Sequence, residues 1–145
     1  MGGKFSRNKG QRAEREVCDL LQPLVDKVYS EFGYVGVQVP KLKRNLAQTQ
    51  DGGYDVSGLV WLSLEVKHQE KLQVDLWWQQ TLDQTGAGQT SVLFYKQNRV
   101  KWLVRIECWV PVGSSFAEGH IRCPGDIKLE AFLVYFEHRL RLELS

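Results

Sequence analysis

The alternating segment at residues 60–67 most constrains how this chain can fold. Its two interleaved sets of side chains are Leu62, Leu64 and Val66, and Trp61, Ser63, Glu65 and Lys67. Because successive side chains of a β-strand point to opposite faces, the apolar set predicts a face that packs on a helix. The other set places a carboxylate beside an ammonium group, at Glu65 and Lys67, so we expect that face to carry a functional site.

Other periodicities predict the rest of the architecture. Apolar residues at helical spacing predict a helix over residues 10–31, which Pro23 should kink or divide. The further predicted elements are a strand at 34–39, a hairpin of 54–57 with 60–67, a helix at 75–85, strands at 90–96 and 100–110, an irregular stretch at 113–125, and a last helix from Asp126. This order predicts a single α/β domain over residues 1–145, with a mixed central sheet flanked by helices. A flexible basic arm at 1–9 and a mobile basic loop at 40–53 complete it.

Asp55 can share a face with Glu65 only for some hairpin lengths. Residues directly opposite each other on paired strands point to the same side of a sheet. A two-residue turn sets Asp55 opposite Leu62, on the apolar face, whereas a three-residue turn sets it opposite Ser63 or Glu65. We therefore expect an odd-length loop, or a bulge, between the two strands.

Asp55, Glu65 and the main-chain carbonyl of Val66 form a candidate ligand set for a divalent cation. Magnesium takes oxygen ligands and keeps several waters beside one or two carboxylates. Such a cation lowers the pKa of a bound water and stabilises charge on a scissile phosphate, and Lys67 can orient that water or stabilise the transition state. The alternative is a surface salt bridge between Glu65 and Lys67, which is common on exposed strands.

The first helix offers a third carboxylate. Glu14 lies three residues before Val17 and seven before Leu21, at the border of the apolar stripe, where it can reach a site at the sheet edge. Its alternative role is a favourable interaction of its charge with the helix N-terminus. Glu16 fits the solvent side of the helix.

Positive charge is unevenly distributed, although the formal net charge is only +2. Three clusters contain Lys4, Arg7, Lys9, Arg12 and Arg15; Lys41, Lys43 and Arg44; and Lys96, Arg99, Lys101 and Arg105. Such clusters can converge into one surface for a phosphate backbone, or each can be an ordinary solvated face. Beside an acidic metal constellation, nucleic acid is the better partner. The odd number of cysteines, at unrelated spacings, favours a reduced cytoplasmic protein, and the lack of a long apolar run argues against a membrane partner.

Taken together, these motifs resemble the archaeal-type Holliday junction resolvases and their phage relatives, which belong to the PD-(D/E)xK nuclease superfamily. The matching residues are Lys9-Gly10, Ala13-Glu14-Arg15-Glu16, Arg44, Gly52-Gly53-Tyr54-Asp55 and Glu65-Val66-Lys67. The similarity runs from about Lys9 to Tyr95. It implies a restriction-endonuclease-like domain and a homodimer that nicks opposing strands of a four-way DNA junction symmetrically. No proline precedes Asp55, and the short spacing from Asp55 to Glu65 requires a tight hairpin.

The resemblance also implies roles for single residues. The catalytic set is Glu14, Asp55, Glu65 and Lys67, and the cofactor is Mg²⁺ or Mn²⁺. The implied metal ligands are Asp55, Glu65, the carbonyl of Val66 and, through water, Glu14. Arg15 and Arg44 contact DNA phosphates, and the basic clusters add Lys9, Arg12, Lys41 and Lys43 to the expected DNA-binding residues.

A tryptophan pair followed by a glutamine, Trp77-Trp78-Gln79-Gln80, is also similar to the phage members. It implies that Gln80 hydrogen-bonds near the metal or the scissile phosphate. The alternative places both tryptophans in the core or in a dimer interface, with Gln80 on the helix surface.

Two other functions stay open from the sequence. One is a different nuclease of the same superfamily, of the repair or restriction type. The other is a catalytically silent DNA-binding module. The presence of all four catalytic residues counts against the silent module, which has no chemical need for them.

Overall fold

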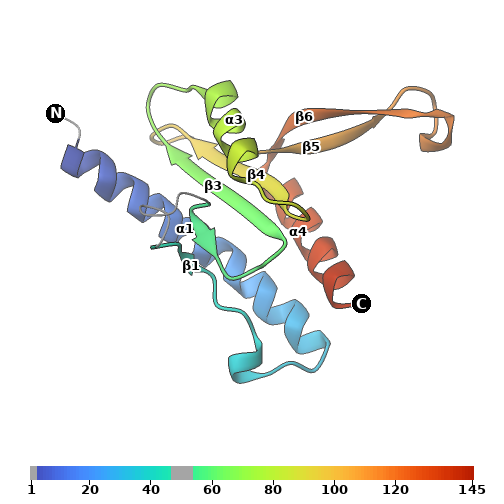
Figure 1. Ribbon diagram of the computed structural model, residues 1–145, viewed down its shortest axis with the longest axis horizontal. Coiled ribbons are helices and arrows are strands. Elements are labelled where there is room, and N and C mark those ends of the chain that lie inside the picture. The colour runs from blue at the N-terminus through green and yellow to red at the C-terminus, as the bar shows by residue number, and fades with distance from the viewer. Residues whose placement is uncertain (1–2, 47–53) are drawn as a thin grey trace.

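The computed structural model describes residues 3–46 and 54–145. Its centre is a six-stranded sheet with the strand order β1-β2-β3-β4-β5-β6 (Figure 1). The strands are β1 (Lys43–Arg44), β2 (Val56–Ser57), β3 (Leu62–His68), β4 (Thr90–Lys96), β5 (Leu103–Pro111) and β6 (His120–Lys128). The helices are α1 (Gly3–Glu31), α3 (Val74–Gln84) and α4 (Leu129–Leu144), with short 3₁₀ helices η1 (Gly36–Gln38) and η2 (Phe116–Glu118). β3 and β4 are parallel and the other neighbours are antiparallel, so the predicted α/β fold with a mixed sheet is confirmed.

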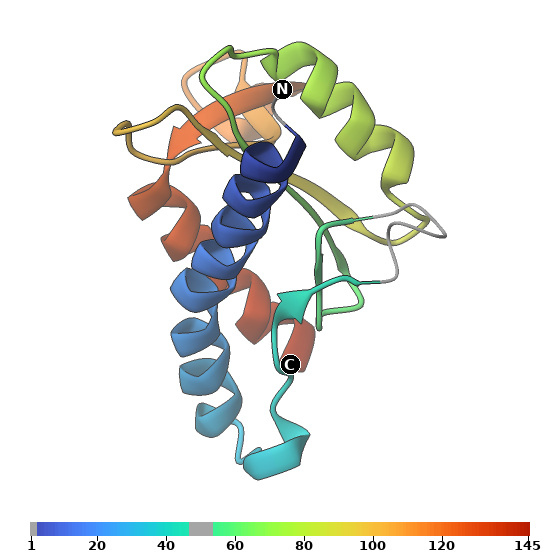
Figure 2. The same cartoon turned by 90° about the vertical axis from the view of Figure 1, so that its left-hand side faces the viewer.

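The main core lies between the sheet and two helices, α1 and α4, which lie side by side (Figures 1 and 2). Val17 and Leu21, from the predicted stripe of α1, are fully buried there. The predicted apolar face of β3, Leu62, Leu64 and Val66, packs into the same core. Burial of these side chains holds the first helix against the strand that carries the charged pair.

α3 covers the opposite face of the sheet. Trp77 and Trp78 are buried there with Leu93 and Tyr95 of β4, so the core alternative for the tryptophan pair is confirmed. Trp61 differs from the prediction, because it precedes β3 and is therefore not bound by the alternation of the strand. It packs in the main core, 6.0 Å from the ring of Phe136, instead of sharing a face with Glu65.

The first helix is longer and less interrupted than predicted. Pro23 lies inside α1 without dividing it, because it is on the exposed side and the carbonyl that loses its partner, at the exposed Asp19, can bond to water. The expected arm at 1–9 is helical from Gly3. Good helix formers continue the helix there, and the Arg7 guanidinium donates to the carbonyl of Gly3 at 3.2 Å.

Two further predictions are wrong in the stretch before β2. The strand expected at 34–39 is replaced by η1, because Gly33 and Gly36 adopt positive φ angles of 85° and 58° that break an extended chain. The loop expected at 40–53 contains strand β1, which pairs with β2. The rest of the predicted loop, including Gly52 and Gly53, falls on residues 47–53 and lies outside the described residues.

The stretch expected to be irregular at 113–125 contains most of β6, and the last helix begins at Leu129 rather than near Asp126. Pro124 and Gly125 are typical of loops, so the sequence pattern does not predict this strand. β6 tolerates Pro124 because it is an edge strand, where the N–H that proline lacks is not needed by a second neighbour.

β5 and β6 continue beyond the other strands as a two-stranded ribbon (Figure 1). Near its end, Trp109 stacks on His120 with ring centroids 4.6 Å apart. At its base, Arg105 donates to both carboxylate oxygens of Asp126 at 2.9 Å and to Asp75 of α3 at 2.8 Å. These ion pairs tie the ribbon to α3. None of the helices in the described part of the chain is both long enough and apolar enough to cross a membrane.

Phe132 tests how far the fold depends on the packing of α4. Its fully buried ring lies 5.1 Å from that of Phe94 in β4. We expect Phe132→Ala to lower the free energy of unfolding by about 3–5 kcal/mol, because it leaves a cavity in the core. Val134→Ala is the control on the same helix, at a side chain that is 59% exposed, and should change it by about 0.5 kcal/mol or less. Urea titration of both variants measures the difference, and equal losses would contradict this view of α4.

Candidate active site

The register between β2 and β3 brings Asp55 and Glu65 together. Val56 pairs with Leu64, so an odd number of residues separates the two partners, as predicted. Asp55, one residue before Val56, then lies alongside Glu65. Its main-chain N–H donates to the carbonyl of Leu64 at 2.9 Å, and its Oδ2 accepts the N–H of Val66 at 2.8 Å. Two hydrogen bonds to the same strand therefore fix the position of the Asp55 carboxyl group.

Both carboxyl groups are buried, with Asp55 7% and Glu65 5% exposed. Burial, together with the charge of Asp55 and a hydrogen bond to it, raises the pKa of Glu65 from 4.5 to about 9, and the charge of Lys67 only partly opposes this shift. Two carboxylates so close to each other do not both ionise without compensation. The pair therefore needs either a proton or a cation between its oxygens.

α1 adds a third buried carboxyl group to this region. Glu14 is 8% exposed, and its Oε2 accepts a hydrogen bond from Nε of Arg44 in β1 at 3.1 Å. Burial and the charge of Asp55 raise the pKa of Glu14, and the Arg44 guanidinium opposes that shift. The structure thus confirms that Glu14 reaches the sheet edge, and it places Arg44 against Glu14.

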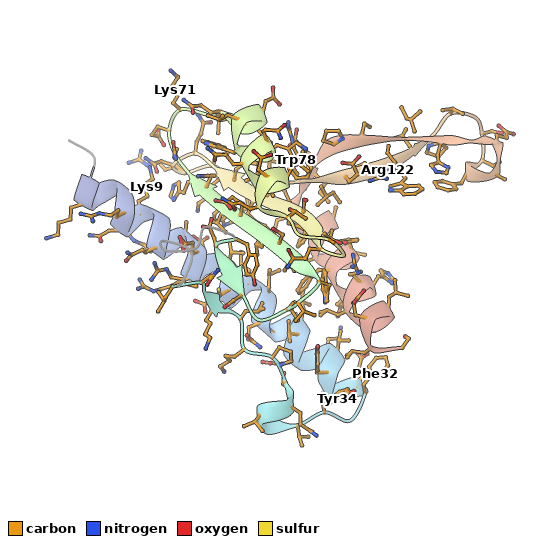
Figure 3. The ribbon with its side chains drawn as sticks, in the orientation of Figure 1. Lys9, Phe32, Tyr34, Lys71, Trp78 and Arg122 are labelled. Carbon is orange, nitrogen blue, oxygen red and sulfur yellow. The ribbon has the colours of Figure 1, made fainter. Side chains whose placement is uncertain are left out.

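Lys67 completes the group of four residues that the sequence singled out. Its Nζ lies 3.8 Å from Oε1 of Glu65, and its side chain is 23% exposed. The group opens into a cavity of about 530 Å³. Its lining is Lys9, Gly10, Glu14, Asp55, Glu65, Val66, Lys67, His68, Gln69, Glu70 and Lys71. Lys9 on α1 and Lys71 after β3 lie on the same side of the molecule (Figure 3), so ammonium groups border a cavity with carboxyl groups at its base.

The donor set fits a hard divalent cation in part. In residues 3–46 and 54–145, no three His, Cys, Asp or Glu side chains form a ready-made cation site. Asp55 and Glu65 nevertheless offer carboxylate oxygens at one point, where their mutual repulsion favours a neutralising cation. Magnesium commonly binds through one or two carboxylates plus waters, so two carboxyl groups beside an open cavity meet its needs.

The predicted DNA-binding residues lie around α1, with one exception. Lys9 lines the cavity, and Arg12 and Arg15 are exposed on the same helix. Arg15 borders a second hollow together with Lys43 and Arg44, next to the carboxyl group of Glu14. Lys41 is separate, because it borders another hollow farther along α1 with Gln22 and Asp26.

His68 and Gln80 differ in their position relative to the cavity. The ring of His68 lies 6.4 Å from that of Trp102, whose side chain belongs to the main core, and His68 also lines the cavity. Gln80 is half-buried on α3 and is not among the residues that line the cavity. Its catalytic role stays a prediction.

Sequence reasoning missed the segment that follows β3, where Gln69, Glu70 and Lys71 line the cavity. This segment is held by the turn after β4, because Glu70 accepts the main-chain N–H of Asn98 at 2.6 Å and the side chain of Gln97 at 2.7 Å. A signal was present in the sequence. The polar residues 69–71 directly follow the strand that carries Glu65 and Lys67, so they leave the sheet at the end of the strand where this charged pair lies.

Glu65 gives this site a pH dependence that can be measured. Because the pKa of Glu65 is raised from 4.5 to about 9 by burial and by Asp55, the metal-free folded protein should bind more protons than the unfolded chain between these values. The free energy of unfolding should therefore fall as the pH rises through this window. We expect Glu65→Gln to flatten that fall in urea titrations from pH 5 to pH 9 with chelator present. Asp83→Asn, at an exposed carboxylate of α3, should keep the wild-type slope. A Glu65→Gln profile as steep as that of the wild type would contradict this electrostatic account.

A comparison with protein families places these residues in a known context. Residues 5–123 match the model of a family described as "Phage putative PDDEXK endonuclease". No curated protein and no solved structure matches the chain. The family match covers most of the chain, including all four residues of the carboxylate and lysine group, and the mixed sheet with its helices is consistent with a restriction-endonuclease-like α/β fold. The chain therefore belongs to this phage PDDEXK endonuclease family, within the PD-(D/E)xK nuclease superfamily.

Proposed function

We propose that the protein is a metal-dependent, structure-selective DNA endonuclease that resolves four-way junctions by paired symmetric nicks. The observation that carries this proposal is the buried pair of Asp55 and Glu65, beside Lys67, at the base of an open cavity in a chain of an endonuclease family. A pair of carboxyl groups that needs a cation, and that lies next to a fixed ammonium group, suits hydrolysis of a phosphodiester.

The chemistry follows from the roles that each side chain can take. Asp55, Glu65 and the carbonyl of Val66 would hold Mg²⁺ or Mn²⁺, with Glu14 reached through a water. When bound, the cation supplies a water of lowered pKa and neutralises charge on the scissile phosphate. Lys67 orients the attacking water or stabilises the developing negative charge, because its ammonium group borders the same cavity. The hydrogen bond from the Val66 N–H keeps the Asp55 carboxyl group oriented while the substrate binds.

The substrate would be held by the cations around α1. Lys9, Arg12 and Arg15 lie on that helix, and Lys43 with Arg44 lies at the neighbouring sheet edge. Side chains of this kind contact phosphates, and such contacts position DNA without reading its bases. Recognition of backbone and shape is what a branched substrate requires.

Two active sites are needed for paired nicks, so the proposal includes a homodimer whose two-fold axis relates two identical cavities. The resemblance of Lys9 to Tyr95 to junction resolvases supports the four-way junction as the substrate. A second candidate is a nuclease of the same superfamily that acts on other DNA. The family description names an endonuclease and no particular substrate, so it is compatible with this second candidate.

The first test compares a labelled four-way junction with a linear duplex of the same sequence, each with magnesium and with chelator. We expect paired nicks in the junction, with magnesium only. Equal cleavage of both substrates would instead support the second candidate. Junction binding without cleavage in magnesium or manganese would indicate a silent DNA-binding module.

Asp55→Asn tests the proposed metal ligand. We expect this variant to lose cleavage by about a thousandfold or more, because a carboxylate that anchors the metal is removed. Junction binding in chelator should persist, since the amide oxygen can still accept the N–H of Val66. Asp83→Asn is the matched control on the α3 surface and should cleave like the wild type. If Asp55→Asn is folded and still cleaves, the assignment of Asp55 is wrong.

A further inference from the structure

A second large hollow lies on the other side of α1 from the buried carboxyl groups. It has a volume of about 860 Å³ and is formed by α1, the turn between β4 and β5, and the start of α4. Its lining is Glu16, Lys96, Val100, Lys101, Trp102, Leu103, Lys128, Leu129 and Glu130. We call this feature the lysine hollow. Lys96 and Lys101, from the third basic cluster of the sequence, meet Lys128 from a distant part of the chain in it.

The wall of the lysine hollow is a fixed network. Oε1 of Glu16 accepts the indole N–H of Trp102 at 3.0 Å, and its Oε2 lies 3.5 Å from Nζ of Lys96. The same ammonium group lies 4.8 Å from the centre of the Trp102 ring. These contacts engage the Glu16 carboxylate, so it does not cancel the charge of the other two lysines.

Lys101 and Lys128 supply that remaining charge. Both are exposed, and neither has an ion-pair partner within residues 3–46 and 54–145. Lys128 also precedes the first turn of α4, where no side chain caps the helix, and the positive end of the helix dipole adds to its field. Glu130 is the opposing group, a carboxylate on the rim of the same hollow.

The lysine hollow and the active-site cavity are neighbours. His68 lines the cavity, Trp102 lines the hollow, and their rings lie 6.4 Å apart. Glu14 and Glu16, two residues apart on α1, line the cavity and the hollow respectively. The exposed N-terminal half of α1 therefore forms a ridge between two concave surfaces.

The third basic cluster of the sequence is divided by this arrangement. Arg105 is engaged by Asp126 and Asp75 at the base of the ribbon. Lys96 and Lys101 turn instead into the lysine hollow, where Lys128 joins them. The ammonium groups of Lys101 and Lys128 are thus available beside the ridge.

We infer that the lysine hollow binds the phosphate backbone of a second segment of branched DNA while the segment to be cut lies in the active-site cavity. The inference rests on the proposed function. A branched DNA molecule can place one segment of its backbone on each side of the ridge. A single straight duplex that is bound in the cavity runs along one side of the ridge only. The hollow would thus contribute to selectivity for branched DNA rather than to the chemistry.

The test measures binding of the full chain to a labelled four-way junction and to a linear duplex, in chelator, over a series of salt concentrations. The variants are Lys101→Gln with Lys128→Gln, Glu130→Gln, and Arg122→Gln as control. We expect the double lysine variant to weaken junction binding about tenfold or more and to lower its salt slope by about two, because two phosphate contacts are lost. Its duplex affinity should fall less than threefold.

The other variants separate a local effect from a loss of overall charge. Arg122 is exposed on the ribbon, far from Lys9 and Lys71 (Figure 3), and its neutralisation should leave junction affinity unchanged. Glu130→Gln should tighten junction binding, because it removes the carboxylate that opposes the lysines. The two lysines lie on the surface, so thermal unfolding of the double variant should match that of the wild type.

Three results would overturn the inference: unchanged junction affinity in the double lysine variant, equal losses on junction and duplex, or an equal loss in Arg122→Gln. A different result would contradict the proposed function itself: a wild-type protein that neither binds the junction more tightly than the duplex nor cleaves it with magnesium. In that case the inference falls with it, because no second DNA segment is selected. If the wild-type protein cleaves junctions and the double lysine variant binds them with unchanged affinity, the inference is wrong and the proposed function stands.

Discussion

The candidate active site depends on how Asp55 is anchored to β3. Its main chain donates to the carbonyl of Leu64, and its side chain accepts the N–H of Val66, so both ends of the residue are fixed by one strand. This anchoring holds a second carboxyl group against Glu65 in a buried position, although the two repel each other. The hydrogen bonds and the surrounding core offset that repulsion. The result is a preorganised site with a deficit of positive charge, which a proton or a cation can fill.

The other site residues take their positions from the burial of α1. Val17 and Leu21 are fully buried and fix the rotation of the helix, and Glu14 lies about one turn before Val17, toward the sheet edge. The same rotation leaves Arg12 and Arg15 exposed. One packed stripe therefore determines which charges of the helix enter the cavity and which face outward. Arg44 from β1 then meets Glu14 and limits the cost of its burial.

Short-range periodicity was sufficient to predict the main parts of this site. The period of two on β3 placed Glu65 and Lys67 together, and the parity of the hairpin required the register that brings Asp55 beside them. Long-range pairing was not predictable in the same way. β6 was missed because its Pro124 and Gly125 are typical of loops, and only its pairing with β5 makes it a strand. The ion pairs of Arg105 were missed for the same reason, since Asp75 and Asp126 meet it only in the folded chain.

The distribution of charge explains why a nearly neutral chain can act on a polyanion. A phosphate backbone that enters the cavity meets the carboxyl groups of Glu14, Asp55 and Glu65, and those that are ionised repel it. Cations act against that repulsion from within the cavity, at Lys9, Lys67 and Lys71, and from outside it, along the ridge of α1 and at the edge of β1. Because burial and the charge of Asp55 raise the pKa of Glu65, the proposed function links the binding of a cation, the release of the proton and the approach of the backbone through the same groups. A change that weakens the repulsion between Asp55 and Glu65, such as Glu65→Gln, should therefore stabilise the metal-free protein and at the same time remove one of the proposed metal ligands.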